Sequence, residues 1–322
     1  MELANLVIDL GGTQVRTAVF GPDGVPRGRM HERSRLEDGP RGALAQMVRM
    51  GRASLQAASV ERDRLGRVVV SCPGPLDSRA GVVLDPPNLP GWERVPLKAW
   101  LDGAFGVPSR IVNDANVAAL GEFTAGAGRG TRNMVYLTIS TGIGGGIIVD
   151  GELLEGSSGT AGEIGHMTID LHGPTCPCGN VGCLEVLASG TSIARRFREA
   201  LDALPDAPNE RADQRGFTAA DVAFAAGDGD VLASTVFLEC ARAVGFGVVN
   251  CIHIFNPDAV VLGGGVVQAG PLLFGPVRET VERYTLAVPR SAVRVERAEL
   301  GDDAGLMGAA LLALREGDSS QL

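Results

Sequence analysis

The sequence lacks the features that mark several large classes of protein. Its first residues, MELANLVIDLGG, contain no basic segment followed by an apolar stretch and a small-residue cleavage site, so no secretory signal is expected. No uninterrupted apolar run approaches the ~20 residues that a membrane-spanning helix needs. Six cysteines in 322 residues are too few for a disulfide framework. We therefore expect a cytoplasmic protein with reduced thiols and no membrane partner.

Positive charge is also in short supply. The chain has 29 Lys and Arg residues against 38 Asp and Glu residues, which gives a net charge of −9. An acidic surface repels the phosphate backbone of nucleic acids and anionic lipid heads, so we expect no nucleic-acid partner. An anionic small ligand would need local positive potential from backbone amides and a metal ion.

Two common phosphoryl-transfer motifs are missing as well. The chain contains neither the Walker pattern GxxxxGK[ST] nor the set of motifs that marks a protein kinase. Any phosphoryl transfer by this protein must therefore use another fold.

Glycine, in contrast, is abundant, with 45 residues, many of which end short β-branched runs. Four such runs lie at 6–10, 68–71, 134–140 and 259–262, and two of them lead through a glycine turn into a second run, at 15–20 and 146–149. Strands that alternate with helical segments are typical of an α/β fold. We interpret the two strand–turn–strand pairs as the starts of two related lobes, because 322 residues exceed what one core usually holds.

Helical periodicity predicts the intervening elements. Apolar residues on one face predict helices at 43–58, 116–124, 193–204, 231–246 and 304–314. Residues 205–216 are rich in Pro, Asp and Arg and predict an exposed loop.

Both glycine turns can bind the phosphates of a nucleotide. The first reads Asp9-Leu10-Gly11-Gly12-Thr13, and the second spans 140–146. Glycines let backbone N–H groups approach an anion closely, and a threonine in each turn adds a hydroxyl. Asp9 can hold Mg²⁺ directly or through water, since a hard cation prefers carboxylate oxygens. The alternative is that both turns are tight hairpins that bind no ligand. This alternative accounts for either turn alone, but it accounts less well for the presence of two such turns in one chain.

A histidine and three cysteines have the composition of a metal site. His166 precedes Cys176, Cys178 and Cys183, and one imidazole with three thiolates matches a closed tetrahedral zinc site of the structural type. His172 is a weaker alternative as the fourth ligand. A disulfide with a bystander thiol competes with zinc, but Cys176 and Cys178 are too close in sequence for an easy bridge.

The other three cysteines and two carboxylates near the predicted zinc site also lead to predictions. Cys72, Cys240 and Cys251 lie on apolar stretches and are expected to be buried, inert thiols. Glu163 and Glu185 flank the predicted zinc loop, which would be a rigid support for hydroxyl-binding groups of a substrate pocket.

Asp114 is the candidate general base. It follows a strand-like run and precedes a predicted helix in the segment Asn113-Asp114-Ala115-Asn116. A positioned carboxylate can accept the proton of a sugar hydroxyl as the P–O bond forms, and Asn113 offers a donor and an acceptor to such a hydroxyl. Taken alone, the segment favours Asp114 as the N-cap of the helix.

Together these motifs resemble those of the ROK family of repressors, open reading frames and sugar kinases, over nearly the whole chain. The resemblance is strongest to the branch of ATP-dependent bacterial glucokinases. It is carried by DLGGT at 9–13, PNLPGW at 87–92, NDAN at 113–116, TGIGGG at 141–146, GEIGH at 162–166 and CPCGNVGCLE at 176–185. The last two segments together are highly specific.

The resemblance implies an α/β fold of the actin-like ATPase (ribonuclease H-like) type, with two lobes around a cleft. The expected lobes are an N-terminal one of residues 1–115, joined by a C-terminal helix at 304–317, and a larger one of residues 116–303 with the zinc loop at 166–183. It also implies a cytoplasmic ATP-dependent kinase that phosphorylates a hexose, most simply glucose, at the 6-hydroxyl. Homodimers or homotetramers are expected.

The resemblance assigns roles residue by residue. Asp114 becomes the catalytic base. The implied sugar contacts are Asn88, Asn113, Asp114, Glu163, His166 and Glu185. The implied contacts to ATP and Mg²⁺ are Asp9, Gly11, Gly12, Thr13, Thr141, Gly142, Gly144, Gly264 and Gly265. The implied zinc ligands are His166, Cys176, Cys178 and Cys183.

Other activities within the family stay open. The acceptor can instead be N-acetylmannosamine, N-acetylglucosamine or fructose, and the chain departs from the commonest family pattern at Val186 and Leu187, where an aromatic residue often follows the glutamate. A sugar-sensing regulator is the non-enzymatic alternative. The family's repressors carry a helix-turn-helix before the DLGGT strand, and here that strand begins within the first ten residues, so we expect an enzyme.

Overall fold

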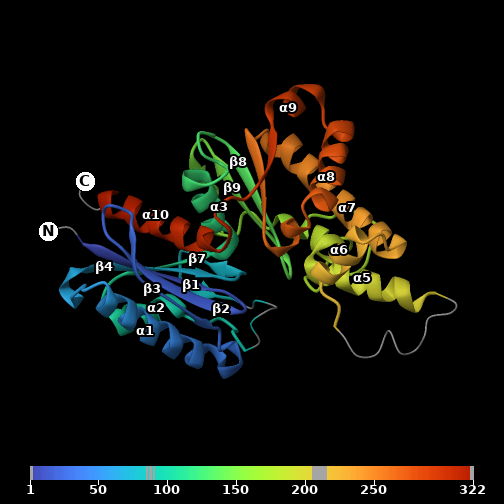
Figure 1. Ribbon diagram of the computed structural model, residues 1–322. Coiled ribbons are helices and arrows are strands. Elements are labelled where there is room, and N and C mark those ends of the chain that lie inside the picture. The colour runs from blue at the N-terminus through green and yellow to red at the C-terminus, as the bar shows by residue number, and fades with distance from the viewer. Residues whose placement is uncertain (1–2, 85, 87–88, 90, 205–215, 320–322) are drawn as a thin grey trace. The chain divides into compact units, whose positions relative to one another are not determined.

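The structure is a computed structural model that describes residues 3–84, 86, 89, 91–204 and 216–319 (Figure 1). The chain forms two compact units. The first comprises Met1–Gly130, Leu153–Gly162 and Leu300–Leu322, and the second comprises Thr131–Glu152 and Glu163–Glu299. The first unit continues past residue 115, where the sequence predicted that the lobe ends, because helix α3 (Asp114–Ala125) packs against helix α10 (Ala304–Ser319).

A five-stranded sheet forms the centre of the first unit, in the order β3-β2-β1-β4-β7. Strands β1 and β2 form an antiparallel hairpin, β2 pairs with β3, and β1, β4 and β7 run parallel to one another. The bounds are β1 Ala4–Leu10, β2 Gln14–Phe20, β3 Pro26–Arg33, β4 Leu65–Cys72 and β7 Ser109–Asn113. A separate two-stranded ribbon is formed by β5 (Leu76–Asp77) and β6 (Val82–Val83).

Helices cover both faces of this sheet. Figure 1 shows α1 (Gly39–Ala57) and α2 (Leu97–Phe105) on one face and α3 with α10 on the other. Successive side chains of a strand point to opposite faces of the sheet, and helices cover both faces. Strands β1 and β4 are therefore buried almost throughout.

The second unit is built on a sheet of the same design. Its order is β10-β9-β8-β11-β12, with β8 and β9 in an antiparallel hairpin and β8, β11 and β12 parallel. The bounds are β8 Met134–Ile139, β9 Ile143–Val149, β10 Glu152–Leu153, β11 Ala259–Gly263 and β12 Arg294–Arg297. The hairpin followed by parallel strands repeats the arrangement of the first unit, which confirms the prediction that the two glycine-turn hairpins begin two related sheets.

The core of the second unit is organised around its longest helix, α7 (Val231–Phe255), which contacts five other helices. The helices are α4 Leu184–Ala188, α5 Gly190–Asp202, α6 Ala219–Gly227, α8 Pro271–Tyr284 and α9 Ala287–Ala292. By length and composition α7 is the one described helix that could span a membrane. Its buried positions, among them Phe237, Val244 and Val248, instead pack into this core.

The predicted elements lie where the sequence placed them, with different ends. All five predicted helices are present, but α7 ends nine residues later than the pattern indicated, at Phe255 instead of residue 246. The predicted loop at 205–216 lies almost entirely outside the described residues. Asn88, a predicted sugar contact, also lies outside them.

Candidate active site

The first group of candidate residues lies at one edge of the first sheet. The parallel strands place Asp9 of β1 opposite Ser71 of β4, and Cys72 of β4 opposite Asn113 of β7. Asp114 follows directly as the first residue of α3. Because the carboxyl ends of parallel strands meet at the same edge, the sheet brings both aspartates to the position where α/β proteins usually bind ligands.

Asp9 is a buried carboxylate, with 8% of its surface exposed. Burial raises its pKa, against the opposing effects of the neighbouring Ser71 hydroxyl and of the Arg16 charge. Arg16 donates to Asp9 Oδ2 at 3.2 Å and also pairs with Asp302 at 3.0 Å. The turn that follows is open, since Gly12 and Thr13 are exposed. The structure therefore places a carboxylate next to an exposed glycine turn, as the binding of Mg²⁺ and phosphate would require.

Asn113, and not Asp114, is the N-cap of α3. The Oδ1 atom of Asn113 accepts hydrogen bonds from the N–H groups of Ala115 at 2.9 Å and Asn116 at 3.2 Å. The interpretation of Asp114 as the cap is therefore wrong, although its Oδ1 also accepts from Ala115 N at 2.8 Å. The cap occupies the side-chain oxygen of Asn113, so only its amide nitrogen is left to donate to a ligand.

Cys72 lies beside both aspartates. Its thiol is fully buried, and burial together with the charges of Asp114 and Asp9 raises its pKa. Burial likewise raises the pKa of Cys240 to about 11 and that of Cys251 to about 12. The structure confirms the prediction that these three cysteines are buried, and a protonated buried thiol is a poor nucleophile.

The second glycine turn is held by Glu185. Its Oε2 atom accepts a hydrogen bond from the N–H of Ile143 at 2.8 Å, and a side chain at Gly142 would overlap this carboxylate. The turn is also tied to α5, since Gly190 N donates to Ser140 O at 2.7 Å. Glu185, predicted only as a sugar contact, thus also fixes the second glycine turn.

Gly264 and Gly265 lie at the same edge of the second sheet as this turn. Strand β11 pairs with β8 up to the pair Gly263–Thr138, and Gly264 follows with φ = 85°, a conformation that favours glycine. The two predicted phosphate-binding segments of this unit therefore leave neighbouring strands side by side.

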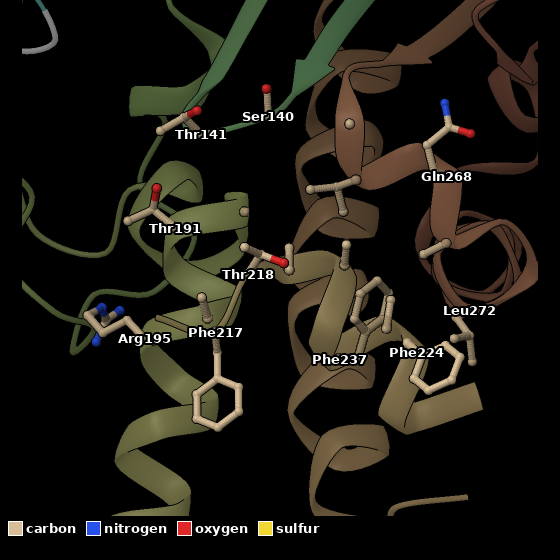
Figure 2. A pocket seen from close by; sticks show the side chains of 18 of the residues that line it. Ser140, Thr141, Thr191, Arg195, Phe217, Thr218, Phe224, Phe237, Gln268 and Leu272 are labelled. Carbon is tan, nitrogen blue, oxygen red and sulfur yellow. The ribbon is translucent and has the colours of Figure 1, made fainter. Parts of the chain in front are cut away.

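A cavity of about 870 Å³ opens from these segments into the second unit. Figure 2 shows the hydroxyl groups of Ser140 and Thr141 on one side and the rings of Phe217, Phe224 and Phe237 on the other. Its size lies in the range of small-molecule sites, and a mostly apolar lining with few polar groups suits a flat heterocyclic base.

Most of the cavity lining was missed by sequence reasoning. Besides Thr141 and Gly265, it includes Thr191 and Arg195 of α5, Gln268, Leu272 of α8, and four residues of α6, which are Ala219, Ala220, Ala223 and Phe224. Gln268 Oε1 is already bonded to Arg297 Nη2 at 2.6 Å, and Arg195 is paired with Glu199 at 2.7 Å. These residues come from separate elements, so no local pattern in the sequence marks them.

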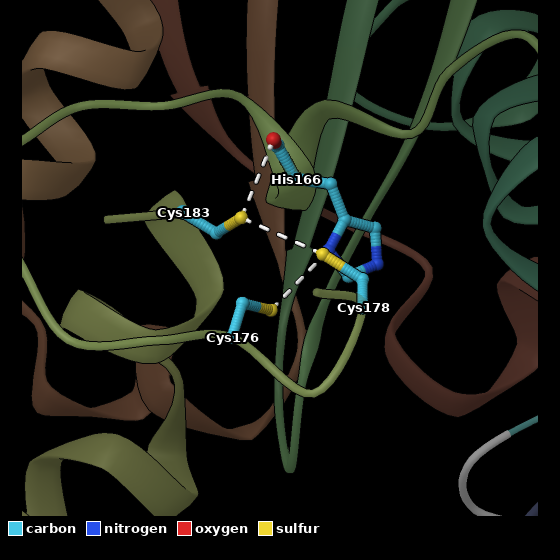
Figure 3. A group of neighbouring side chains, drawn as sticks. All are labelled: His166, Cys176, Cys178 and Cys183. Atoms are coloured by element: carbon cyan, nitrogen blue, oxygen red, sulfur yellow. Dashed lines mark hydrogen bonds between the residues drawn. The ribbon is translucent and has the colours of Figure 1, made fainter. Parts of the chain in front are cut away.

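The four predicted zinc ligands converge. The ligand atoms of His166, Cys176, Cys178 and Cys183 all lie within 4.8 Å of one another (Figure 3). The distance is 3.7 Å between His166 Nδ1 and Cys176 Sγ, and 3.8 Å between the sulfur atoms of Cys178 and Cys183. These match the roughly 3.5–3.8 Å between ligands of a tetrahedral zinc ion. Burial raises the pKa of Cys183 to about 12, so a cation is needed to hold it as thiolate.

The alternative arrangements of this cluster are not supported. His172 lies outside the group and is exposed, and all three thiols are free. The second nitrogen of His166, Nε2, lies 4.0 Å from Glu163 Oε2. Such carboxylate partners orient histidine ligands of metal sites.

Glu163 connects this cluster to the second glycine turn. Partial burial raises its pKa, against the effect of the His166 charge, and the charge of Glu185 adds to the rise. The structure therefore brings Glu163, His166 and Glu185 together on the second unit, while Asn113 and Asp114 lie together on the first.

Comparison with known proteins agrees with the motifs. The model of the ROK family matches residues 5–316. A glucokinase of Thermotoga maritima is 36% identical over 317 residues, with 96% of both chains covered. An N-acetylmannosamine kinase of Escherichia coli O9:H4 is 35% identical, with 98% of this chain and 99% of the relative covered.

Solved structures show the same similarity. A ROK hexokinase from Thermus thermophilus matches with a TM-score of 0.80 at 35% identity, covering 98% of this chain and all of the other. A Streptomyces griseus ROK glucokinase, solved with glucose and AMPPNP, matches at 0.78 and 31%, covering 96% and 98%. A ROK transcriptional regulator matches at 0.83 and 28%, covering 98% and 79%. The predicted fold class, an α/β fold of the actin-like ATPase type, is confirmed.

Proposed function

Because the chain belongs to the ROK family, we propose that it transfers the γ-phosphoryl group of ATP to the 6-hydroxyl of a hexose, with glucose as the acceptor. The observation that carries this proposal is the cavity of the second unit, which begins at the hydroxyl-bearing turn of Ser140 and Thr141 and ends on an apolar, aromatic surface. A nucleoside triphosphate has the matching polarity, with an anionic end and an apolar base.

The nucleotide is held by the predicted glycine turns. Thr141, Gly142 and Gly144 with Gly264 and Gly265 bind phosphate oxygens through backbone amides and one hydroxyl. On the first unit, Gly12 and Thr13 would supply the corresponding amides beside Gly11, whose own N–H is bonded to Gln14 O at 2.9 Å, and Asp9 would hold Mg²⁺. The metal ion, when bound, offsets the charge that develops during phosphoryl transfer.

Asp114 is the proposed catalytic base. It accepts the proton of the attacking hydroxyl, while the amide nitrogen of Asn113 donates to the sugar. Asn88, Glu163, His166 and Glu185 are the other proposed sugar contacts. Carboxylates and an imidazole suit this task because each can bond to hydroxyl groups that carry both a donor and an acceptor.

Zinc has a structural role in this proposal. His166, Cys176, Cys178 and Cys183 would fill all four positions of the ion, which leaves none for a substrate. Bound there, the ion would fix the loop at 166–183 and orient His166, whose Nε2 atom lies 4.0 Å from Glu163 Oε2. We also propose that the protein is cytoplasmic, binds no nucleic acid or membrane, and forms homodimers or homotetramers.

An N-acetylhexosamine is the second candidate acceptor. It is favoured by the similarity to an N-acetylmannosamine kinase, which is nearly as high as that to a glucokinase. N-acetylglucosamine and fructose belong to the same test. A sugar-sensing regulator is the non-enzymatic candidate, favoured by the similarity to a transcriptional regulator and opposed by the presence of Asp114 with both glycine turns.

The test is a coupled assay of ADP release with MgATP and a panel of glucose, fructose, mannose, N-acetylmannosamine and N-acetylglucosamine. Glucose should give the highest kcat/KM. A higher kcat/KM for an N-acetylhexosamine would replace the acceptor, and ADP release with no member of the panel above the rate without sugar would overturn the kinase proposal.

A further inference from the structure

Glu122 of α3 is a carboxylate with no exposed surface. Its Oε2 atom accepts a hydrogen bond from the N–H of Ala127 at 2.9 Å, and its Oε1 atom accepts one from the N–H of Leu300 at 2.8 Å. Its backbone carbonyl accepts two more, from Gly126 and Gly128. Burying a carboxylate is costly unless its oxygens are bonded, so this arrangement indicates a specific task.

The two amides lie next to two of the connections between the units. The chain passes from the first unit to the second between Gly130 and Thr131, and it returns between Glu299 and Leu300. Leu300 is 178 residues away from Glu122 in the sequence. One side chain therefore binds the chain at the start of one connection and at the end of the other.

The helices next to these connections form a tightly packed pair. A side chain at Gly308 of α10 would overlap the carbonyl of Val117, and one at Gly121 of α3 would overlap the carbonyl of Ala304. The backbones of α3 and α10 thus touch directly, which leaves little room for them to shift against each other. Glu122 binds both connections to this pair.

The same pair carries the proposed catalytic groups of the first unit. Asp114 is the first residue of α3, eight residues or about 12 Å along the helix from Glu122. On α10, a side chain at Gly305 would lie 3.0 Å from Asp9 Oδ1. The position of both connections is therefore mechanically linked to the position of Asp114 and Asp9.

We infer that Glu122 is a positioning residue, which fixes both connections to the α3–α10 pair so that they leave the first unit at a set place relative to Asp114. The inference rests on the proposed function, because phosphoryl transfer draws on Asp114 of the first unit and on the nucleotide cavity of the second. Glu122 touches neither substrate, so its effect should appear in the catalytic step and not in nucleotide binding.

The first test is Glu122→Gln, which keeps the size but turns an amide N–H₂ toward one of the two N–H donors. We expect kcat for hexose phosphorylation to fall by about tenfold or more while KM for ATP changes by less than about threefold. The exchange of the Ala127 and Leu300 amides with deuterium should become faster, since each loses or weakens its acceptor.

A second variant, Leu300→Pro, removes one donor and leaves Glu122 in place. Leu300 has φ = −81°, which a proline ring accepts. It should lower kcat in the same direction as Glu122→Gln, and it decides the matter if Glu122→Gln fails to fold. Met47→Ala is the control, because Met47 is buried in the core of the same unit on α1 and bonds to neither connection.

The outcomes separate the inference from the proposed function. Wild-type protein without hexokinase activity would remove the proposed function itself. The role of Glu122 would be overturned if the wild type is active and the folded Glu122→Gln and Leu300→Pro variants keep kcat within about threefold of it. It would also be overturned if these variants lost no more kcat than Met47→Ala, with each variant assayed equally far below its own melting temperature.

Discussion

Asp9 illustrates how one residue can serve function at the expense of stability. Its pKa is raised above the ordinary value of 3.8, chiefly by burial, although Arg16 and Ser71 favour its charged form. The carboxyl group of Asp9 therefore binds its proton more tightly in the native protein than in the unfolded chain. Between pH 3.8 and the raised pKa, the stability that Asp9 contributes falls as the pH rises, and above this window the charged form remains a cost.

Asp9→Asn should separate these two effects. The amide removes the buried charge, so we expect the free energy of unfolding near pH 7 to rise relative to wild type, and the difference to shrink as the pH falls toward 3.8. Kinase activity should fall, because an amide is a poor Mg²⁺ ligand. Urea unfolding at several pH values measures the first effect. A variant that is less stable than wild type near pH 7 would show that the ion pair with Arg16 outweighs the cost of burial.

Gly142 is required by the carboxylate that holds the second turn. In Gly142→Ala the new methyl group displaces Glu185 Oε2 and weakens its bond to Ile143 N. We expect a loss of about 1–3 kcal/mol in stability, measured by thermal unfolding. Gly12→Ala is the matched control for stability, since no atom lies within 4 Å of its added methyl group. Equal stability of the two variants would contradict the assigned role of Glu185.

The choice between Asn113 and Asp114 as the helix cap shows a limit of sequence reasoning at the residue scale. Asparagine and aspartate cap helices about equally well, and helix ends can be predicted only to within a few residues. The sequence could therefore identify the segment but not which residue bonds to the first-turn amides. The two hydrogen bonds to Asn113 decide the question.

At the scale of elements, the central strands of both sheets were predictable because β-branched runs end at glycine turns, whereas β3, β10 and β12 were not predicted. The errors have local causes. Strand β9 begins at Ile143, before its predicted start, because Gly144 and Gly145 pair with β8 without any side-chain pattern to mark them. Helix α7 continues through Gly245 and Gly247, where close packing against Thr280 and Leu184 replaces the apolar side chains that the periodicity requires.

The zinc loop is the element whose stability depends most directly on a ligand. Cys183→Ser should abolish stoichiometric zinc binding and expose the loop at 166–183 to proteolysis and hydrogen exchange, because its backbone is held by turns and isolated bridges and not by a long helix or a sheet. Cys251→Ala, which changes a buried thiol in the same unit, should retain one zinc per chain. Metal analysis of both purified variants checks this, and full zinc content in Cys183→Ser would contradict the ligand set.

At the scale of the whole molecule, the repetition of one sheet design was predictable, but the nucleotide cavity was not. The two strand–turn–strand patterns in the sequence indicate the repetition. The cavity is assembled from α5, α6 and the segment before α8, and its aromatic residues are indistinguishable from core residues until the helices are placed around α7. Long-range packing of this kind leaves no periodic signal along the chain.

The central claim is that Asp114 accepts the proton of a sugar hydroxyl during transfer from ATP. Its most direct test is the rate of transfer of the labelled γ-phosphoryl group of ATP to glucose by wild type and Asp114→Asn. The variant keeps the side-chain shape and an oxygen for Ala115 N, so it should fold and bind the nucleotide normally. We predict a loss of about 10²–10⁴-fold in kcat. A folded variant that transfers phosphate within about threefold of the wild-type rate would contradict the account.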